Sequence, residues 1–97
     1  MLHAYWFKPN GGKDAYDQFM KEVLPLIEKA GGQKLRSVVP ERALVGEFDA
    51  DLMYFVEYPS WAAYRGFANS SQYHKVAYKL RDAVDKSLLV RCARPEK

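Results

Sequence analysis

The chain has little of what metal, disulfide and membrane proteins are built from. It contains one cysteine, Cys92, and two histidines among its 97 residues. One cysteine cannot form a disulfide within the chain or supply a zinc site, so we expect no metal. A lone thiol fits a reducing compartment, and the N-terminus does not resemble a signal peptide, so we predict a cytoplasmic protein.

Long apolar runs and blocks of like charge are also missing. No apolar run approaches the roughly 20 residues of a membrane helix, so we expect no membrane partner. Fifteen basic and twelve acidic residues are interspersed and leave a net charge of +3, which predicts no nucleic-acid partner. The small basic cluster near the C-terminus is interpreted as a solvated tail (Arg91, Arg94, Lys97).

No motif for binding a phosphate or activating a nucleophile is present. The two glycine pairs, Gly11-Gly12 and Gly31-Gly32, are typical of turns and not of a phosphate-binding loop. No nucleophile elbow occurs. We therefore expect no cofactor, so that catalysis would use the protein's own side chains, unless a haem or flavin binds without a motif.

Apolar and aromatic residues are plentiful, at 48% and 14% of the chain, and support one packed domain over residues 1–97. Hydrophobic periodicity divides this domain into strands and helices. The strands are predicted at 2–7, 33–39, 52–58 and 87–93, and the helices at 13–30, 61–68 and 72–86. Residues 43–48 continue the second strand or form a short companion, and Ser60 is placed to cap the helix that begins at Trp61.

The element order is β-α-β-β-α-β, which predicts an α+β, ferredoxin-like fold with an antiparallel sheet and its helices on one face. The other sheet face is also apolar on the first, third and fourth strands. Because an exposed face of that kind is adhesive, we expect a homodimer that packs sheet on sheet about a two-fold axis.

A stripe on the last helix carries the candidate catalytic residues. His74, Tyr78, Arg81 and Asp85 follow one another at helical spacing beside the apolar face. His74 could act as a general base, and Arg81 could hold an anionic group of a substrate. The alternative interpretation is a helix flank with an Arg81–Asp85 ion pair and a half-exposed histidine.

Aromatic side chains provide candidate substrate-binding residues for a flat organic molecule. The candidates are Trp6, Tyr54, Trp61 and Tyr78, with Tyr58 and Tyr64 as further members of an aromatic pocket. The alternative is that these rings belong to the core. His3 is expected to be packed and hydrogen-bonded, and Cys92 to be a small buried apolar residue.

Several short strings resemble a known superfamily. They are Ala15-Tyr16, Leu26-Ile27-Glu28-Lys29 before Gly31-Gly32, Gly46, Val56-Glu57-Tyr58-Pro59-Ser60, Ser70 with Tyr73, and Arg81. In these strings and in element order, the chain resembles the dimeric α+β barrel superfamily. Within it, the chain is similar to a family of small bacterial proteins of unassigned function, distantly related to antibiotic-biosynthesis monooxygenases.

Three functions are compatible with these features. The first is a homodimer of unassigned role that binds a small organic molecule between helices and sheet. The second, implied by the resemblance, is a cofactor-independent monooxygenase, isomerase or cyclase acting on an aromatic or polyketide-like substrate. The third is a non-catalytic interaction or stress-related protein.

Overall fold

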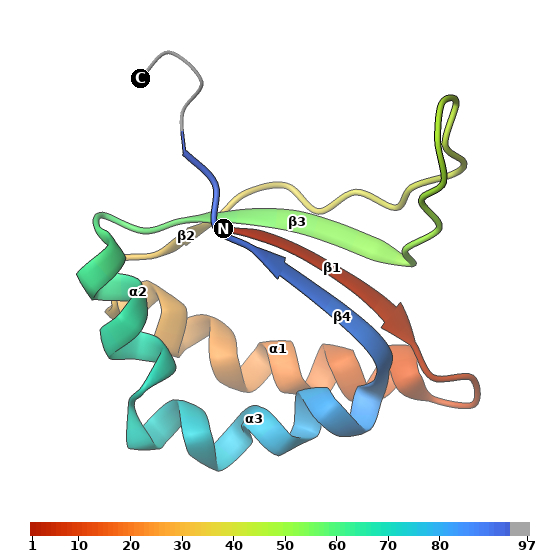
Figure 1. The fold of residues 1–97 in the computed structure, drawn as a ribbon. Helices are drawn as coiled ribbons and strands as arrows, with labels where there is room; N and C mark the ends of the chain where they lie inside the picture. Colours follow the sequence, from red (N-terminus) through yellow and green to blue (C-terminus); the bar gives the residue numbers. More distant parts are fainter. Residues whose placement is uncertain (94–97) are drawn as a thin grey trace.

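A four-stranded antiparallel sheet carries all three helices on one of its faces (Figure 1). The computed structural model describes residues 1–93. The elements are β1 (Leu2–Phe7), α1 (Gly12–Lys29), β2 (Gln33–Lys34), β3 (Leu52–Glu57), α2 (Trp61–Ala68), α3 (Ser71–Ala83) and β4 (Val84–Val90). The strand order is β2-β3-β1-β4. This arrangement confirms the predicted α+β, ferredoxin-like fold with its helices on one face.

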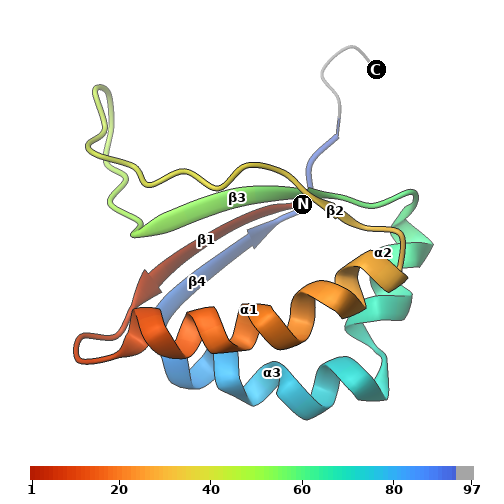
Figure 2. The same cartoon turned by 180° about the vertical axis from the view of Figure 1, so that it is seen from behind.

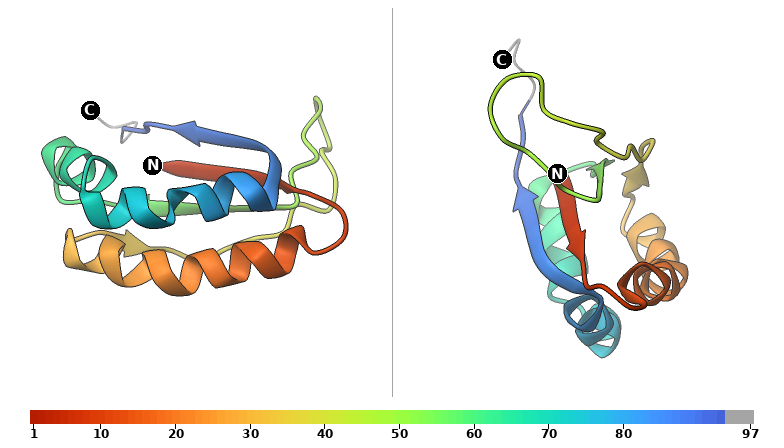
Figure 3. Two further views of the ribbon diagram at one scale, coloured as in Figure 1. Left: turned by 90° about the horizontal axis from the view of Figure 1, so that it is seen from below. Right: turned by 90° about the vertical axis from the view of Figure 1, so that its right-hand side faces the viewer.

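The core lies between α1 and the middle of the sheet. Four side chains of α1 at helical spacing are buried: Tyr16, Phe19, Val23 and Ile27. They pack against Tyr54 and Val56 of β3, and α1 and α3 run side by side along the same sheet face (Figures 2 and 3). An apolar stripe of this width allows a helix to bury one of its faces against a sheet.

The face of the sheet away from the helices, here called the open face, is apolar. Strand pairing places Leu2 opposite Phe55 and Val90, and Ala4 opposite Met53 and Leu88. Paired residues point to the same side, and these alternate along the strands with the buried core residues. Phe55, Leu88 and Val90 are 43%, 39% and 37% exposed, so the open face presents apolar side chains to its surroundings.

The second strand is much shorter than predicted. The expected strand over 33–39 is reduced to two residues, followed by an isolated bridge between Val38 and Met53. The predicted companion at 43–48 is absent, because that part of the chain leaves the sheet. Residues 39–51 form a long loop on the side of the open face (Figure 1). On this side the Trp6 indole N–H donates a hydrogen bond to Asp49 Oδ1 at 2.8 Å.

The last helix ends earlier than predicted and the last strand begins earlier. α3 stops at Ala83, and Val84 already has extended backbone and pairs with Phe7 of β1. Asp85 therefore belongs to β4, and the predicted four-residue stripe on α3 loses its final member. The helical pattern of the sequence continues to Lys86 without a stop signal, so only the pairing with β1 reveals the end of the helix.

Candidate functional site

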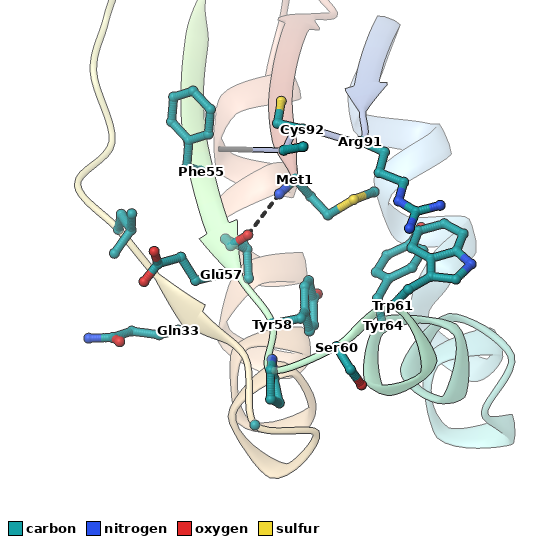
Figure 4. Close-up of a pocket in the computed structure, with 15 residues that line it drawn as sticks. Met1, Gln33, Phe55, Glu57, Tyr58, Ser60, Trp61, Tyr64, Arg91 and Cys92 are labelled. Carbon is teal, nitrogen blue, oxygen red and sulfur yellow. Dashed lines mark hydrogen bonds between the residues drawn. The ribbon is translucent and has the colours of Figure 1, made fainter. Parts of the chain in front are cut away.

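An open groove of about 700 Å³ lies where β3, α2 and the segment after β4 meet (Figure 4). We call it the terminal groove. Its residues come from the turn before β2, the ends of β2 and β3, the start of α2, and both ends of the described chain. They are Met1, Gly31, Gln33, Leu35, Phe55, Val56, Glu57, Tyr58, Pro59, Ser60, Trp61, Tyr64, Arg91, Cys92 and Ala93.

The turn after β3 fixes the aromatic wall of the groove. Ser60 has extended backbone, and its hydroxyl accepts a hydrogen bond from the Ala63 N–H at 3.0 Å, which confirms the predicted helix cap. Trp61 and Tyr64 are then three residues apart on one face of α2. Their rings stack with centroids 5.2 Å apart, and Tyr58 meets Tyr64 edge-on at 5.3 Å.

A cation stands on this aromatic wall. The Arg91 guanidinium carbon lies 4.1 Å from the centre of the Trp61 ring, a cation–π contact between the segment after β4 and the start of α2 (Figure 4). Arg91 was expected in a solvated tail; it is exposed, but its guanidinium also packs on Trp61, which was not expected. The other two residues of that predicted tail, Arg94 and Lys97, lie outside the described residues.

One of the lining residues, Tyr58, carries a buried hydroxyl. Burial, followed by nearby Tyr64 and Tyr73, raises the pKa of Tyr58 to about 12, so the phenol stays neutral. Its buried oxygen has no hydrogen-bond partner among the described residues. The N-terminal ammonium donates to the Val56 carbonyl at 2.9 Å, which ties the start of the chain to β3.

A second polar cluster is buried between α1 and the sheet. His3 Nδ1 lies 3.0 Å from the Tyr5 hydroxyl, and that hydroxyl lies 3.3 Å from the Tyr54 hydroxyl. The His3 and Tyr54 rings stack at 4.8 Å, and Tyr16 packs on Tyr5 at 5.1 Å. These rings occupy the space between helix and sheet where we had expected a small organic ligand.

Burial determines the protonation of this cluster. Burial, and then the charge of the N-terminus, lower the pKa of His3 from 6.5 to about 4. Burial likewise raises the pKa values of Tyr5, Tyr16 and Tyr54 above the ordinary phenol range. The expectation that His3 is packed and hydrogen-bonded is confirmed, and the cluster is neutral at pH 7.

The predicted catalytic residues lie outside both regions. His74 and Arg81 are exposed on α3. They line neither the terminal groove nor a second cavity, which lies between the open face and the 39–51 loop. Asp85, on β4, is no longer in helical register with them. The catalytic role of His74 and Arg81 therefore stays a prediction, and neither residue lines one of these two cavities.

The four predicted substrate-binding residues are not brought together. Trp61 lines the terminal groove, and Tyr54 is a core residue at 2% exposure. Trp6 lines a separate cavity of about 880 Å³ between the open face and the 39–51 loop. Tyr78 is 48% exposed on α3. The further pocket candidates, Tyr58 and Tyr64, do join Trp61 in the groove.

Two residues of the groove were misread from the sequence. Cys92, expected to be buried in a strand, is exposed beyond the end of β4 and lines the groove. Arg91 gave no signal, because its position depends on where β4 ends. Within residues 1–93, no three His, Cys, Asp or Glu side chains are placed to hold a metal ion. No helix in the same range has the length and hydropathy of a bilayer span.

Comparison with known proteins identifies the family. A family model described as a domain of unknown function, DUF1330, matches residues 4–91. The chain belongs to the DUF1330 family. No curated protein matches it significantly.

Solved structures share the fold of this DUF1330 protein. The RPA0582 protein of unknown function from Rhodopseudomonas palustris is 24% identical with a TM-score of 0.86, over 97% of this chain and 81% of that one. The methylated RPA0582 protein is 26% identical with a TM-score of 0.82, over 99% of this chain and 81% of that one. An uncharacterized NIPSNAP domain protein from Burkholderia xenovorans is 12% identical with a TM-score of 0.67, over 95% and 92%. The predicted kinship with monooxygenases stays a resemblance.

Proposed function

We propose that this DUF1330 protein binds a small organic molecule in the terminal groove. The observation that carries the proposal is the stacked pair Trp61 and Tyr64, which forms a rigid aromatic wall on a groove of about 700 Å³. Ligand sites in proteins commonly measure about 300–1,000 Å³ and combine aromatic walls with a few polar groups. Here Ser60 and Arg91 are among the polar groups.

Binding is favoured over catalysis because the predicted catalytic residues do not line the groove. No histidine is among the described residues that line it, and His74 and Arg81 lie elsewhere on α3. The Tyr58 phenol, with its raised pKa, is a poor base at pH 7. We therefore rank a binding role above a monooxygenase, isomerase or cyclase.

Naphthalene compounds provide a direct test of the groove. We expect 2-naphthoate or its neutral analogue 2-naphthalenemethanol, at millimolar concentration, to shift the NMR signal of the Trp61 indole N–H. The Trp6 indole N–H, which is bonded to Asp49 on the open face, is expected to stay unchanged.

Two variants complete this test. Trp6→Phe assigns the remaining indole signal to Trp61, and Trp61→Ala is expected to weaken binding about 10-fold, as loss of a central aromatic contact does. If neither compound moves the Trp61 signal, the binding proposal fails.

We further propose that the protein is a homodimer through its open face. Supporting this, Phe55, Leu88 and Val90 present an apolar surface that helices do not cover. At the tip of the 39–51 loop on the same side, Leu44 and Val45 are 85% and 94% exposed. A second copy related by a two-fold axis would meet this surface with an identical one.

Neighbouring leucines of β4 allow a matched test of the dimer. Leu88 lies on the open face and Leu89 on the helix side, with 39% and 48% exposure. Leu88→Asp is expected to weaken dimerisation about 100-fold or more, because it would bury an unpaired carboxylate in the interface. Leu89→Asp is expected to leave the dimer intact. Light scattering after gel filtration measures both, and a monomeric wild-type protein would refute the proposal.

A further inference from the structure

The Arg91 guanidinium is held in place without an acidic partner. Its carbon lies 4.1 Å from the centre of the Trp61 ring, and Trp61 stacks in turn on Tyr64. The ion pairs within residues 1–93 are Lys13–Asp17 and Lys79–Glu22, and neither involves Arg91. The structure therefore keeps a positive charge on the wall of an aromatic groove.

Stacking on an indole uses the flat face of a guanidinium and leaves its N–H groups free at the edge. Five donors in a fixed plane match the two oxygens of a carboxylate, and such charge-assisted pairs are the stronger hydrogen bonds of proteins. Trp61 thus restricts Arg91 before any ligand arrives, which lowers the entropic cost of binding. The net charge of +3 also favours an anion over a cation.

The position of Arg91 determines which way such a ligand lies. Arg91 and Trp61 stand on one side of the groove, and Gln33 and Glu57 line the β2 side (Figure 4). An anionic group paired with Arg91 places the apolar body of the ligand along Met1 and Tyr58, which lie between the two sides (Figure 4).

We infer that the terminal groove selects an organic carboxylate with a flat, apolar body, and that Arg91 is the residue that selects the charge. This inference rests on the proposed binding role, because it specifies the ligand class of the same groove. It assigns to Arg91 the discrimination between an acid and a neutral compound of the same shape.

Calorimetric titration with 2-naphthoate and 2-naphthalenemethanol separates charge from shape. The wild-type protein is expected to bind the carboxylate about 10-fold more tightly than the alcohol. Arg91→Gln is expected to bring the two affinities to about the same value, because it removes the pairing that only the carboxylate can make. Arg91→Lys retains the charge but loses the planar fork, so part of the preference is expected to remain.

Arg65→Gln is the matched control. Arg65 is exposed on α2 and does not line the groove. Its replacement by glutamine removes the same positive charge as Arg91→Gln. The preference for the carboxylate is expected to survive in this variant. Because Arg91 is also exposed, circular dichroism of Arg91→Gln is expected to match that of the wild type.

The outcomes distinguish the two proposals. Equal affinity of the wild-type protein for both compounds, or an unchanged preference in Arg91→Gln, overturns the carboxylate inference and leaves the binding role standing. A preference lost equally in Arg65→Gln also overturns it, since a general field and not Arg91 would then be responsible. Failure of both compounds to bind removes the binding role itself.

Discussion

Acidification from pH 7 to about pH 4 is expected to lower the free energy of unfolding by about 3 kcal/mol through His3. The folded-state pKa of His3 is lowered from 6.5 to about 4. Between these values the unfolded chain binds a proton that the folded chain does not, so stability falls as the pH falls. Below the folded-state pKa both states are protonated, and the loss levels off.

The surroundings of His3 give the physical reason. Nδ1 is paired with the Tyr5 hydroxyl, whereas Nε2 is buried and has no partner among residues 1–93. Protonation would place a charged N–H there without an acceptor, in a layer formed by Tyr54 and Tyr5. The neutral ring, in contrast, fits the stack.

Urea denaturation at a series of pH values measures the effect. His3→Phe keeps a ring on Tyr54 but cannot titrate, so its stability profile is expected to be flatter than that of the wild type by about 3 kcal/mol across this window. His74→Phe is the same substitution at an exposed position of α3 and is expected to follow the wild-type profile. Parallel profiles for wild type and His3→Phe would show that His3 is not the acid-sensitive group.

Replacing Gly12 by alanine is expected to destabilise the fold by about 1–3 kcal/mol or more. A Cβ at Gly12 would lie 2.6 Å from the carbonyl oxygen of Ala83, which also accepts the Lys8 N–H at 3.0 Å. The Ala83 carbonyl and the Lys8 N–H both belong to the backbone at the junction of α1, α3 and β4. They cannot move without disturbing the start of β4, so the clash outweighs the better helix propensity of alanine.

Gly66→Ala is the matched control, with the opposite sign. Gly66 lies inside α2, and a Cβ there would meet nothing within 4 Å. The substitution is expected to stabilise the protein by about 0.5–1 kcal/mol through helix propensity. Denaturant unfolding of both variants tests the pair. A Gly12→Ala protein as stable as Gly66→Ala would mean that the junction is less tightly packed than described.

The parts of the fold that depend on local chemistry could be predicted from the sequence. The buried stripe of α1, from Tyr16 to Ile27, follows from helical spacing, and the Ser60 cap follows from its place before Trp61. The fold class followed from the order of these elements. Each of these signals is carried by residues close together in the chain.

The parts that depend on distant contacts could not be predicted. The end of α3 is decided by pairing of Val84 with Phe7, some 77 positions away, and the residues next to Ala83 carry no stop signal for the helix. The same pairing sets the end of β4, and thereby moves Arg91 and Cys92 into the groove. The sequence therefore predicted only part of the proposed ligand site: Trp61 and Tyr64 could be named as pocket residues, but Arg91 could not.

The strand order has a consequence for the timing of folding. β1 lies in the middle of the sheet, yet one of its two partners is β4, which leaves the ribosome last among the described strands. The central strand must wait with one edge unpaired until β4 has been synthesised. Because Arg91 follows directly after β4, the charged wall of the groove forms only when β4 has joined the sheet, and carboxylate binding would report that this sheet is complete.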